Sequence, residues 1–187
     1  DLRLGAMLGD FVRGREALKK FDTGVRSGIM LHRHIDTYTD SLPAVAELRR
    51  QFRSPFRRYA GIIIDLAFDH ELVLRWEAFS DIPIEQFDLE IRDLLARNDD
   101  LLPPNLKSFM KYADRRGLFA SYREQAEILH SLKGISRRFS RPNPLGRVGE
   151  VWHDVEPPIA AAFDPIFQEI QSEVTGWLKS KSTITGS

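Results

Sequence analysis

Prolines and helix-capping residues divide this chain into short segments, and this division limits the fold more than any other feature of the sequence. Ser41 with Pro43, and Ser54 with Pro55, each supply an N-cap and a first-turn proline, which are typical of helix starts. No run alternates apolar and polar residues over the length of a strand. The predicted helices cover residues 23–40, 44–52, 55–79, 84–97, 105–116, 119–133 and 158–179, with the last one kinked or broken at Pro165. The sequence therefore predicts an all-α fold.

The length and composition are those of one globular domain, and we expect this domain to cover residues 1–187. Cysteine is absent, which excludes disulfides and thiolate metal sites and favours a reducing compartment. No apolar run approaches the roughly 20 residues that span a bilayer, so we expect a soluble, cytoplasmic protein that does not enter a membrane. The chain carries 27 basic and 27 acidic residues, and this balance argues against general nucleic-acid binding.

Two basic stretches stand out from this neutral background, and neither contains an acid. The first holds Arg49, Arg50, Arg53, Arg57 and Arg58, and the second holds Lys133, Arg137, Arg138, Arg141 and Arg147. Local basic patches on a neutral chain are suited to binding one anionic partner. The alternative is that each stretch is a solvated helix face.

The stretch "IIIDLAFDHE", residues 62–71, places ionisable side chains in one of the most apolar runs of the chain. Asp65 and Asp69 are four residues apart, so on a helix they lie on one face, with His70 beside them. Burying a carboxylate is costly unless a cation or a set of hydrogen-bond donors meets it. We therefore expect positive charge close by, either a metal ion or an arginine such as Arg33 or Arg13.

Two further segments place acids or histidines where an ordinary core would not. Asp10 in "LGDFVRG" has apolar neighbours, while His32 and Asp36 repeat at i and i+4 along one face of "MLHRHIDTYTD", followed by Asp40. Taken singly, Asp10 could pair with Arg13, and the histidines could be ordinary residues of an amphipathic helix. Three helices that each offer oxygen or imidazole ligands predict a divalent metal or phosphate site.

At these residues the chain resembles the acyl carrier protein phosphodiesterase family, also called acyl carrier protein hydrolase. The matching text is "GDFVRG", "GIMLHRHIDTYTDSLPAV", "DLAFDHEL" and "ISRRFSR", and the likeness covers nearly the whole chain. The resemblance implies hydrolysis of the phosphodiester that joins 4′-phosphopantetheine to a serine of holo-acyl carrier protein. The products would be apo-acyl carrier protein and free 4′-phosphopantetheine.

The family is regarded as a divergent relative of the HD phosphohydrolases, so the resemblance implies a helical bundle of that type with Mn²⁺ or Mg²⁺ as cofactor. The implied metal ligands are Asp10, His32, Asp36, Asp69 and His70, with catalytic roles for Asp10 and for Asp65, which would orient the ligands. Arg33, Arg137 and Arg138 would neutralise the phosphate. The acidic carrier protein would dock on Arg49, Arg50, Arg53, Arg57, Arg58 and Arg141.

The chain departs from the family pattern in two respects. Asp69-His70 stands in place of the His-Asp dipeptide of the wider HD group. Family members also begin with a histidine-bearing segment that this chain lacks, so we expect a truncated N-terminus. Two other functions stay open at this point, an HD-type phosphohydrolase that acts on a nucleotide and a non-catalytic helical binding module. The sequence does not determine the oligomeric state.

Overall fold

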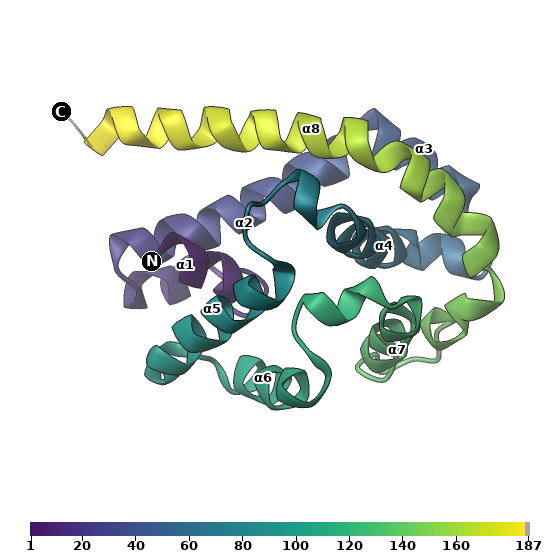
Figure 1. Cartoon of the computed structure of the whole chain (residues 1–187), viewed down its shortest axis with the longest axis horizontal. Coiled ribbons are helices and arrows are strands. Elements are labelled where there is room, and N and C mark those ends of the chain that lie inside the picture. The colour runs from purple at the N-terminus through teal and green to yellow at the C-terminus, as the bar shows by residue number, and fades with distance from the viewer. Residues whose placement is uncertain (186–187) are drawn as a thin grey trace. The chain divides into compact units, whose positions relative to one another are not determined.

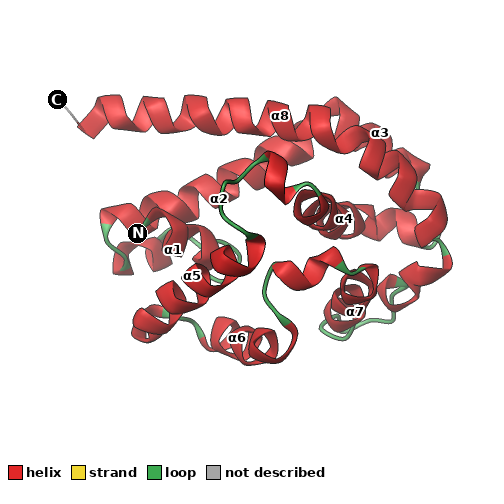
Figure 2. Cartoon of the chain, viewed as in Figure 1, coloured by secondary structure: helices red, strands yellow, loops and turns green. Residues whose placement is uncertain are grey.

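The structure, a computed structural model, describes residues 1–185, with side chains throughout except at 112, 114–116 and 182–185. These residues form helices and loops, and residues 1–185 contain no strand (Figure 2). The all-α prediction is therefore confirmed. The α-helices, labelled in Figure 1, are α1 (Leu2–Leu8), α2 (Thr23–Ser41), α3 (Pro43–Gln51), α4 (Ala60–Leu74), α5 (Ile84–Arg97), α6 (Pro104–Arg116), α7 (Gln125–Ser136) and α8 (Trp152–Thr185).

Several helix boundaries differ from the prediction. Leu42, rather than Ser41, is the N-cap residue of α3, although Pro43 does open that helix. The predicted helix 55–79 is divided into a 3₁₀ turn over residues 56–59, α4 itself, and a second 3₁₀ turn over residues 76–78. Gly117 ends α6 with a φ of 96°, a conformation that glycine adopts without the steric cost of a Cβ atom.

Pro165 was predicted to kink or break the last helix. It does not break it, because α8 begins at Trp152 and continues through Pro165. A proline inside a helix removes one hydrogen bond and costs about 3 kcal/mol. Phe163 and Ile166, on either side of Pro165, are both buried. The burial of these apolar side chains offsets the lost hydrogen bond.

The described residues form two compact units, each assembled from separate parts of the chain. The first unit consists of residues 1–39, 85–118 and 170 onward, and the second of residues 40–84 and 119–169. The first contains α1, most of α2, α5, α6 and the C-terminal part of α8, and the second contains α3, α4, α7 and the N-terminal part of α8. In the described part of the chain, no helix has the length and apolarity to cross a membrane.

In the first unit, α1 and α2 approach so closely that their backbones touch at Gly5 and Gly28. A Cβ atom built on Gly5 would lie 2.0 Å from the carbonyl oxygen of Val25 and 2.7 Å from Cα of Gly28. Ordinary contacts are at least about 3.5 Å, so any larger residue would push the helices apart. Glycine at both positions therefore sets the distance between α1 and α2.

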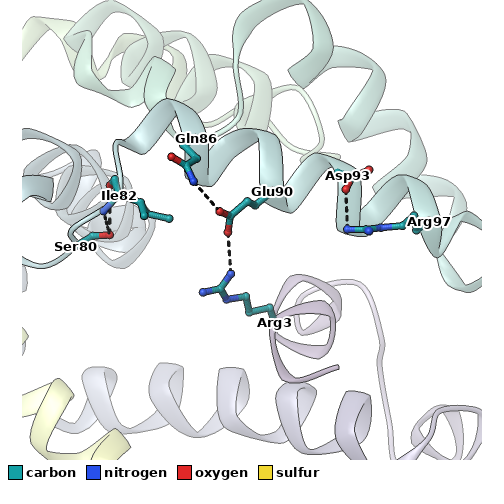
Figure 3. Close-up of polar contacts among 7 residues, drawn as sticks. All are labelled: Arg3, Ser80, Ile82, Gln86, Glu90, Asp93 and Arg97. Carbon is teal, nitrogen blue, oxygen red and sulfur yellow. Dashed lines mark hydrogen bonds and ion pairs between the residues drawn. The ribbon is translucent and has the colours of Figure 1, made fainter.

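Side chains on the other helices of the first unit hold them to α1 and α2. Arg3 of α1 reaches Glu90 of α5 at 3.2 Å, and Gln86 donates a hydrogen bond to the same carboxylate (Figure 3). His34 of α2 lies 2.7 Å from the carboxylate of Glu173 on α8 and stacks against Trp177. His34 thus belongs to the packing of α2 against α8.

The second unit is built around α4, which contacts α3 and α7. Phe163 of α8 is buried and lies edge-on to Phe68 of α4 at 5.8 Å between ring centres. Phe79 and Phe167 complete an aromatic cluster around Phe163. Aromatic rings bury large apolar areas and favour such tilted contacts, so this cluster fixes α8 against α4 within the unit.

Candidate metal centre

Asp10, His32 and Asp36 come together in the first unit. Asp10 lies two residues beyond the end of α1, and the other two lie one turn apart on α2. Nε2 of His32 is 3.3 Å from Oδ1 of Asp10 and 3.3 Å from Oδ2 of Asp36. The imidazole therefore stands between two carboxylates that are 26 positions apart in the sequence.

The glycine-mediated packing of α1 on α2 explains why Asp10 reaches His32. Gly9 lies four residues after Gly5, and His32 four residues after Gly28, so both pairs repeat along the same line of contact. A Cβ atom on Gly9 would lie 2.2 Å from Cγ of His32. The imidazole therefore occupies the space that a larger residue at position 9 would fill, beside Asp10.

A second contact holds the segment after α1 in place. The guanidinium of Arg33, next to His32 on α2, donates a hydrogen bond to the carbonyl oxygen of Val12. Val12 is buried, so this bond ties the segment that carries Asp10 to α2. Through this contact Arg33 positions the backbone of the segment that carries Asp10.

The electrostatics of the cluster follow from the two carboxylates. Hydrogen bonding to Asp10, and then to Asp36, raises the pKa of His32 to about 10, and partial burial opposes this shift. The hydrogen bond from His32 in turn lowers the pKa of Asp10. A proton on Nε2 of His32 is thus the positive charge that the two acids share in this arrangement.

The donor set is suited to a divalent cation. One ligand atom from each of Asp10, His32 and Asp36 lies within 4.8 Å of the other two, so a single ion can reach all three. Two carboxylates with one imidazole suit Mn²⁺ or Mg²⁺ better than soft metals that prefer sulfur. The side chains of Asp10 and Asp36 are 76% and 57% exposed, so a substrate can approach the cluster from solvent.

Asp65, Asp69 and His70 lie on α4 in the second unit. Nδ1 of His70 donates a hydrogen bond to the carbonyl oxygen of Tyr122 over 2.6 Å, which orients the ring and leaves Nε2 available as a ligand. Histidines that bind metals commonly make such a bond. The approach of Asp69 and His70 to the cluster of Asp10, His32 and Asp36 stays a prediction.

The expectation that Asp65 and Asp69 are buried charges is wrong, because both residues are exposed. Their one-turn spacing places them on a shared polar face of α4. The buried acid of this stretch is Glu71, which is 2% exposed. The sequence reasoning missed Glu71, although Arg75 four residues later was a signal for an ion pair along the helix.

Arg75 supplies the positive charge for Glu71. Its guanidinium contacts the Glu71 carboxylate, the carbonyl oxygen of Ala160 at 3.3 Å and the carboxylate of Asp164 at 3.4 Å. The guanidinium carbon also lies 5.2 Å from the ring centre of Phe163. This network, in which Glu71 is the only fully buried charged side chain, connects α4 with α8 inside the second unit and has a structural role.

The arginines proposed to bind substrate or partner, other than Arg33, lie in the second unit. Arg49 pairs with Asp40 and Arg50 with Glu47. Tyr59 packs edge-on against Phe139 at 5.7 Å between ring centres, which brings the two basic stretches close together. Arg53, Arg57, Arg58, Arg137, Arg138 and Arg141 are all exposed.

Comparisons with known proteins support the sequence interpretation. A family model described as "Acyl carrier protein phosphodiesterase" matches residues 1–170. The chain is 35% identical to an acyl carrier protein phosphodiesterase of Escherichia coli O157:H7 over 158 residues, 84% of this chain and 80% of the relative. It is also 35% identical to the protein of the same name from Escherichia coli strain K12 / DH10B over 153 residues, 81% of this chain and 77% of the relative. No solved structure matches the chain, so the likeness to the HD fold stays a prediction.

Proposed function

This chain belongs to the acyl carrier protein phosphodiesterase family, and from that premise we propose that it removes 4′-phosphopantetheine from holo-acyl carrier protein. The chain is a hydrolase of the phosphodiesterase class. Water attacks the phosphorus, the bond from phosphorus to the serine oxygen breaks, and a proton passes to that oxygen. The products are apo-acyl carrier protein and 4′-phosphopantetheine. The observation that carries this proposal is the convergence of Asp10, His32 and Asp36 inside the matched region.

We propose that these three residues hold Mn²⁺ or Mg²⁺. Such an ion would supply positive charge that polarises the phosphoryl group and activates water for attack. His32 gives up its proton on becoming a ligand, because a protonated imidazole has no lone pair to offer. Asp10 and Asp36 compensate the charge of the ion. Asp69 and His70 are proposed to complete the ligand set, with Asp65 orienting them from one turn away.

The remaining roles concern the substrate. Arg33, Arg137 and Arg138 are proposed to neutralise the phosphodiester, because a guanidinium can bind phosphate through two parallel hydrogen bonds. Acyl carrier proteins are acidic helical bundles, so the arginine-rich stretches are proposed to steer their approach. Reversing Arg53 and Arg57 to glutamate should then raise the KM for the carrier protein and leave cleavage of a small phosphodiester nearly unchanged. If the double reversal leaves the KM for the carrier protein unchanged at low salt, this surface does not dock the carrier protein.

The absence of cysteine supports a place in a reducing compartment, and we propose the cytoplasm. The neutral overall charge supports a protein partner over a nucleic acid.

The decisive experiment is incubation of holo-acyl carrier protein with the protein and Mn²⁺, followed by intact mass measurement. Loss of one phosphopantetheine group from the carrier protein is the expected result, with no loss in the presence of EDTA. His32→Ala should abolish the reaction, whereas His153→Ala, at an exposed histidine of the second unit, should not. Hydrolysis of nucleotide phosphodiesters without cleavage of the carrier protein would replace the proposal with the nucleotide function. Metal-independent binding without any hydrolysis would replace it with the binding-module function.

A further inference from the structure

A cavity of about 620 Å³ lies in the second unit, and its lining comes from residues between positions 50 and 58. Four arginines line it, namely Arg50, Arg53, Arg57 and Arg58, together with Phe52 and Ser54. We propose that this cavity is a binding site for a phosphate group carried by a small molecule, formed by residues other than Asp10, His32 and Asp36. All of its lining residues belong to one unit, so its shape follows from the local fold of that segment.

The segment that lines the cavity is anchored by apolar residues on its inner side. Phe52 and Phe56 are 3% and 7% exposed. The backbone N–H groups of Phe56 and Arg57 both donate to the carbonyl oxygen of Arg53, at 2.9 Å and 3.0 Å, and close a turn. Buried phenylalanines and a hydrogen-bonded turn hold the backbone in one conformation. The arginines therefore extend from fixed positions, which reduces the entropy lost when a ligand binds.

The four arginines of the cavity differ in their acidic partners. Arg50 contacts the carboxylate of Glu47. Among the residues whose side chains are described, no acid forms an ion pair with Arg53, Arg57 or Arg58. Three unpaired guanidinium groups around one cavity repel each other, and an anion relieves this repulsion.

The chemistry of the lining favours a phosphate group over other anions. Each guanidinium presents several N–H groups in a plane that matches two phosphate oxygens, and Ser54 adds a hydroxyl donor. The volume of the cavity is within the range of small-molecule sites, roughly 300–1,000 Å³. A doubly charged phosphate monoester or a diphosphate matches three unpaired guanidinium groups better than a single carboxylate does. The free reaction product, 4′-phosphopantetheine, is one source of such a group, and inorganic pyrophosphate is a simple probe.

The test is calorimetric titration of the full chain with inorganic pyrophosphate at constant ionic strength, with EDTA present so that no metal ion mediates binding. Wild-type protein should bind one pyrophosphate saturably. Arg53→Gln/Arg57→Gln should weaken this binding at least tenfold, and Arg58→Gln should weaken it separately. Arg15→Gln, at an exposed arginine of the first unit, is the matched control and should bind like wild type. Circular dichroism and thermal unfolding confirm that each variant is folded.

Parallel titrations with inorganic phosphate and 4′-phosphopantetheine identify the source of the phosphate. Tighter binding of 4′-phosphopantetheine than of inorganic phosphate, lost in the double variant, would assign the site to the product. Equal binding of both would assign it to the phosphate group alone. No saturable pyrophosphate binding, or equal weakening by Arg15→Gln, would overturn the proposal. A double variant that loses only its affinity for the carrier protein would also overturn it, and would leave the proposed phosphodiesterase function intact.

Discussion

Replacing Gly9 with alanine should disable the candidate metal centre without removing any ligand. Gly9 has a φ of −50° and a ψ of −49°, which alanine adopts without strain. The effect of Gly9→Ala is therefore limited to the new methyl group. That methyl group would lie 2.2 Å from Cγ, 2.3 Å from Cδ2 and 2.7 Å from Cβ of His32. Carbon atoms in contact are normally about 3.5–4.0 Å apart.

These distances require His32 to move by roughly 1 Å or more to reach ordinary contact. Rotating only the end of the ring would not suffice, since Cβ is also too close. Nε2 of His32 is 3.3 Å from each carboxylate, so such a shift breaks at least one of these contacts. Metal ligands tolerate displacements of only about 0.2 Å. We expect Mn²⁺ affinity to fall at least tenfold and kcat/KM for holo-acyl carrier protein to fall on the order of 100-fold.

The stability of the fold should change much less, by about 1–3 kcal/mol for overpacking. Gly134→Ala is the matched control, since a Cβ atom on Gly134 in α7 has no neighbour within 4 Å. This control should keep wild-type metal affinity and gain about 0.5–1 kcal/mol of helix stability. Calorimetric titration with Mn²⁺ and the intact-mass assay give the two readouts. Wild-type affinity and activity in Gly9→Ala would refute the assignment of His32 as a ligand at this position.

Four further predictions concern pH, the Glu71–Arg75 ion pair and α4. Hydrogen bonding to Asp10, followed by Asp36, raises the pKa of His32 to about 10, so a cation must displace a proton from His32 in order to bind. The Mn²⁺ affinity measured by calorimetry should therefore rise between pH 6 and pH 8.5. An affinity that does not change with pH would contradict this prediction. The pKa of His32 in the folded protein exceeds its unfolded value near 6.5. In EDTA, protonated His32 therefore stabilises the fold fully below pH 6.5, and this stabilisation disappears as the pH rises through about 10. The thermal unfolding temperature of His32→Gln should differ from that of wild type most at low pH. Arg75→Met leaves the buried Glu71 carboxylate without its arginine and should lower the free energy of unfolding by about 3–5 kcal/mol, measured with denaturant. Glu71→Leu/Arg75→Met should recover most of this stability. Equal destabilisation by the single and the double variant would argue against an ion pair at buried Glu71. Asp69→Ala should abolish hydrolysis and keep the helical circular dichroism spectrum, and full activity at saturating Mn²⁺ would exclude Asp69 from the mechanism.

Some local features of this protein follow from the sequence by itself. Pro43 opens α3 because its ring fixes φ near the helical value, and Gly117 ends α6 because glycine adopts a positive φ without the steric cost of a Cβ atom. His32 and Asp36 share one face of α2 because the helical repeat places residues four apart above one another. Family membership was also evident from motifs near Asp10, His32 and Asp69, and the matched family model and relatives bear it out.

Interactions between distant segments were decided only by tertiary structure. Asp10 reaches His32 because Gly5 and Gly28 let α1 and α2 touch, and spacing along the chain contains no information on that contact. The side of α4 that is buried was also undetermined, because apolar residues occur on several of its faces. In the fold, α4 contacts α3 and α7, and its Phe68 packs against Phe163 of α8; there Glu71 is buried and Asp65 is exposed. The apolar residues of α4 do not form a single face, so its sequence pattern does not specify which side is buried. The helices packed against α4 determine that side.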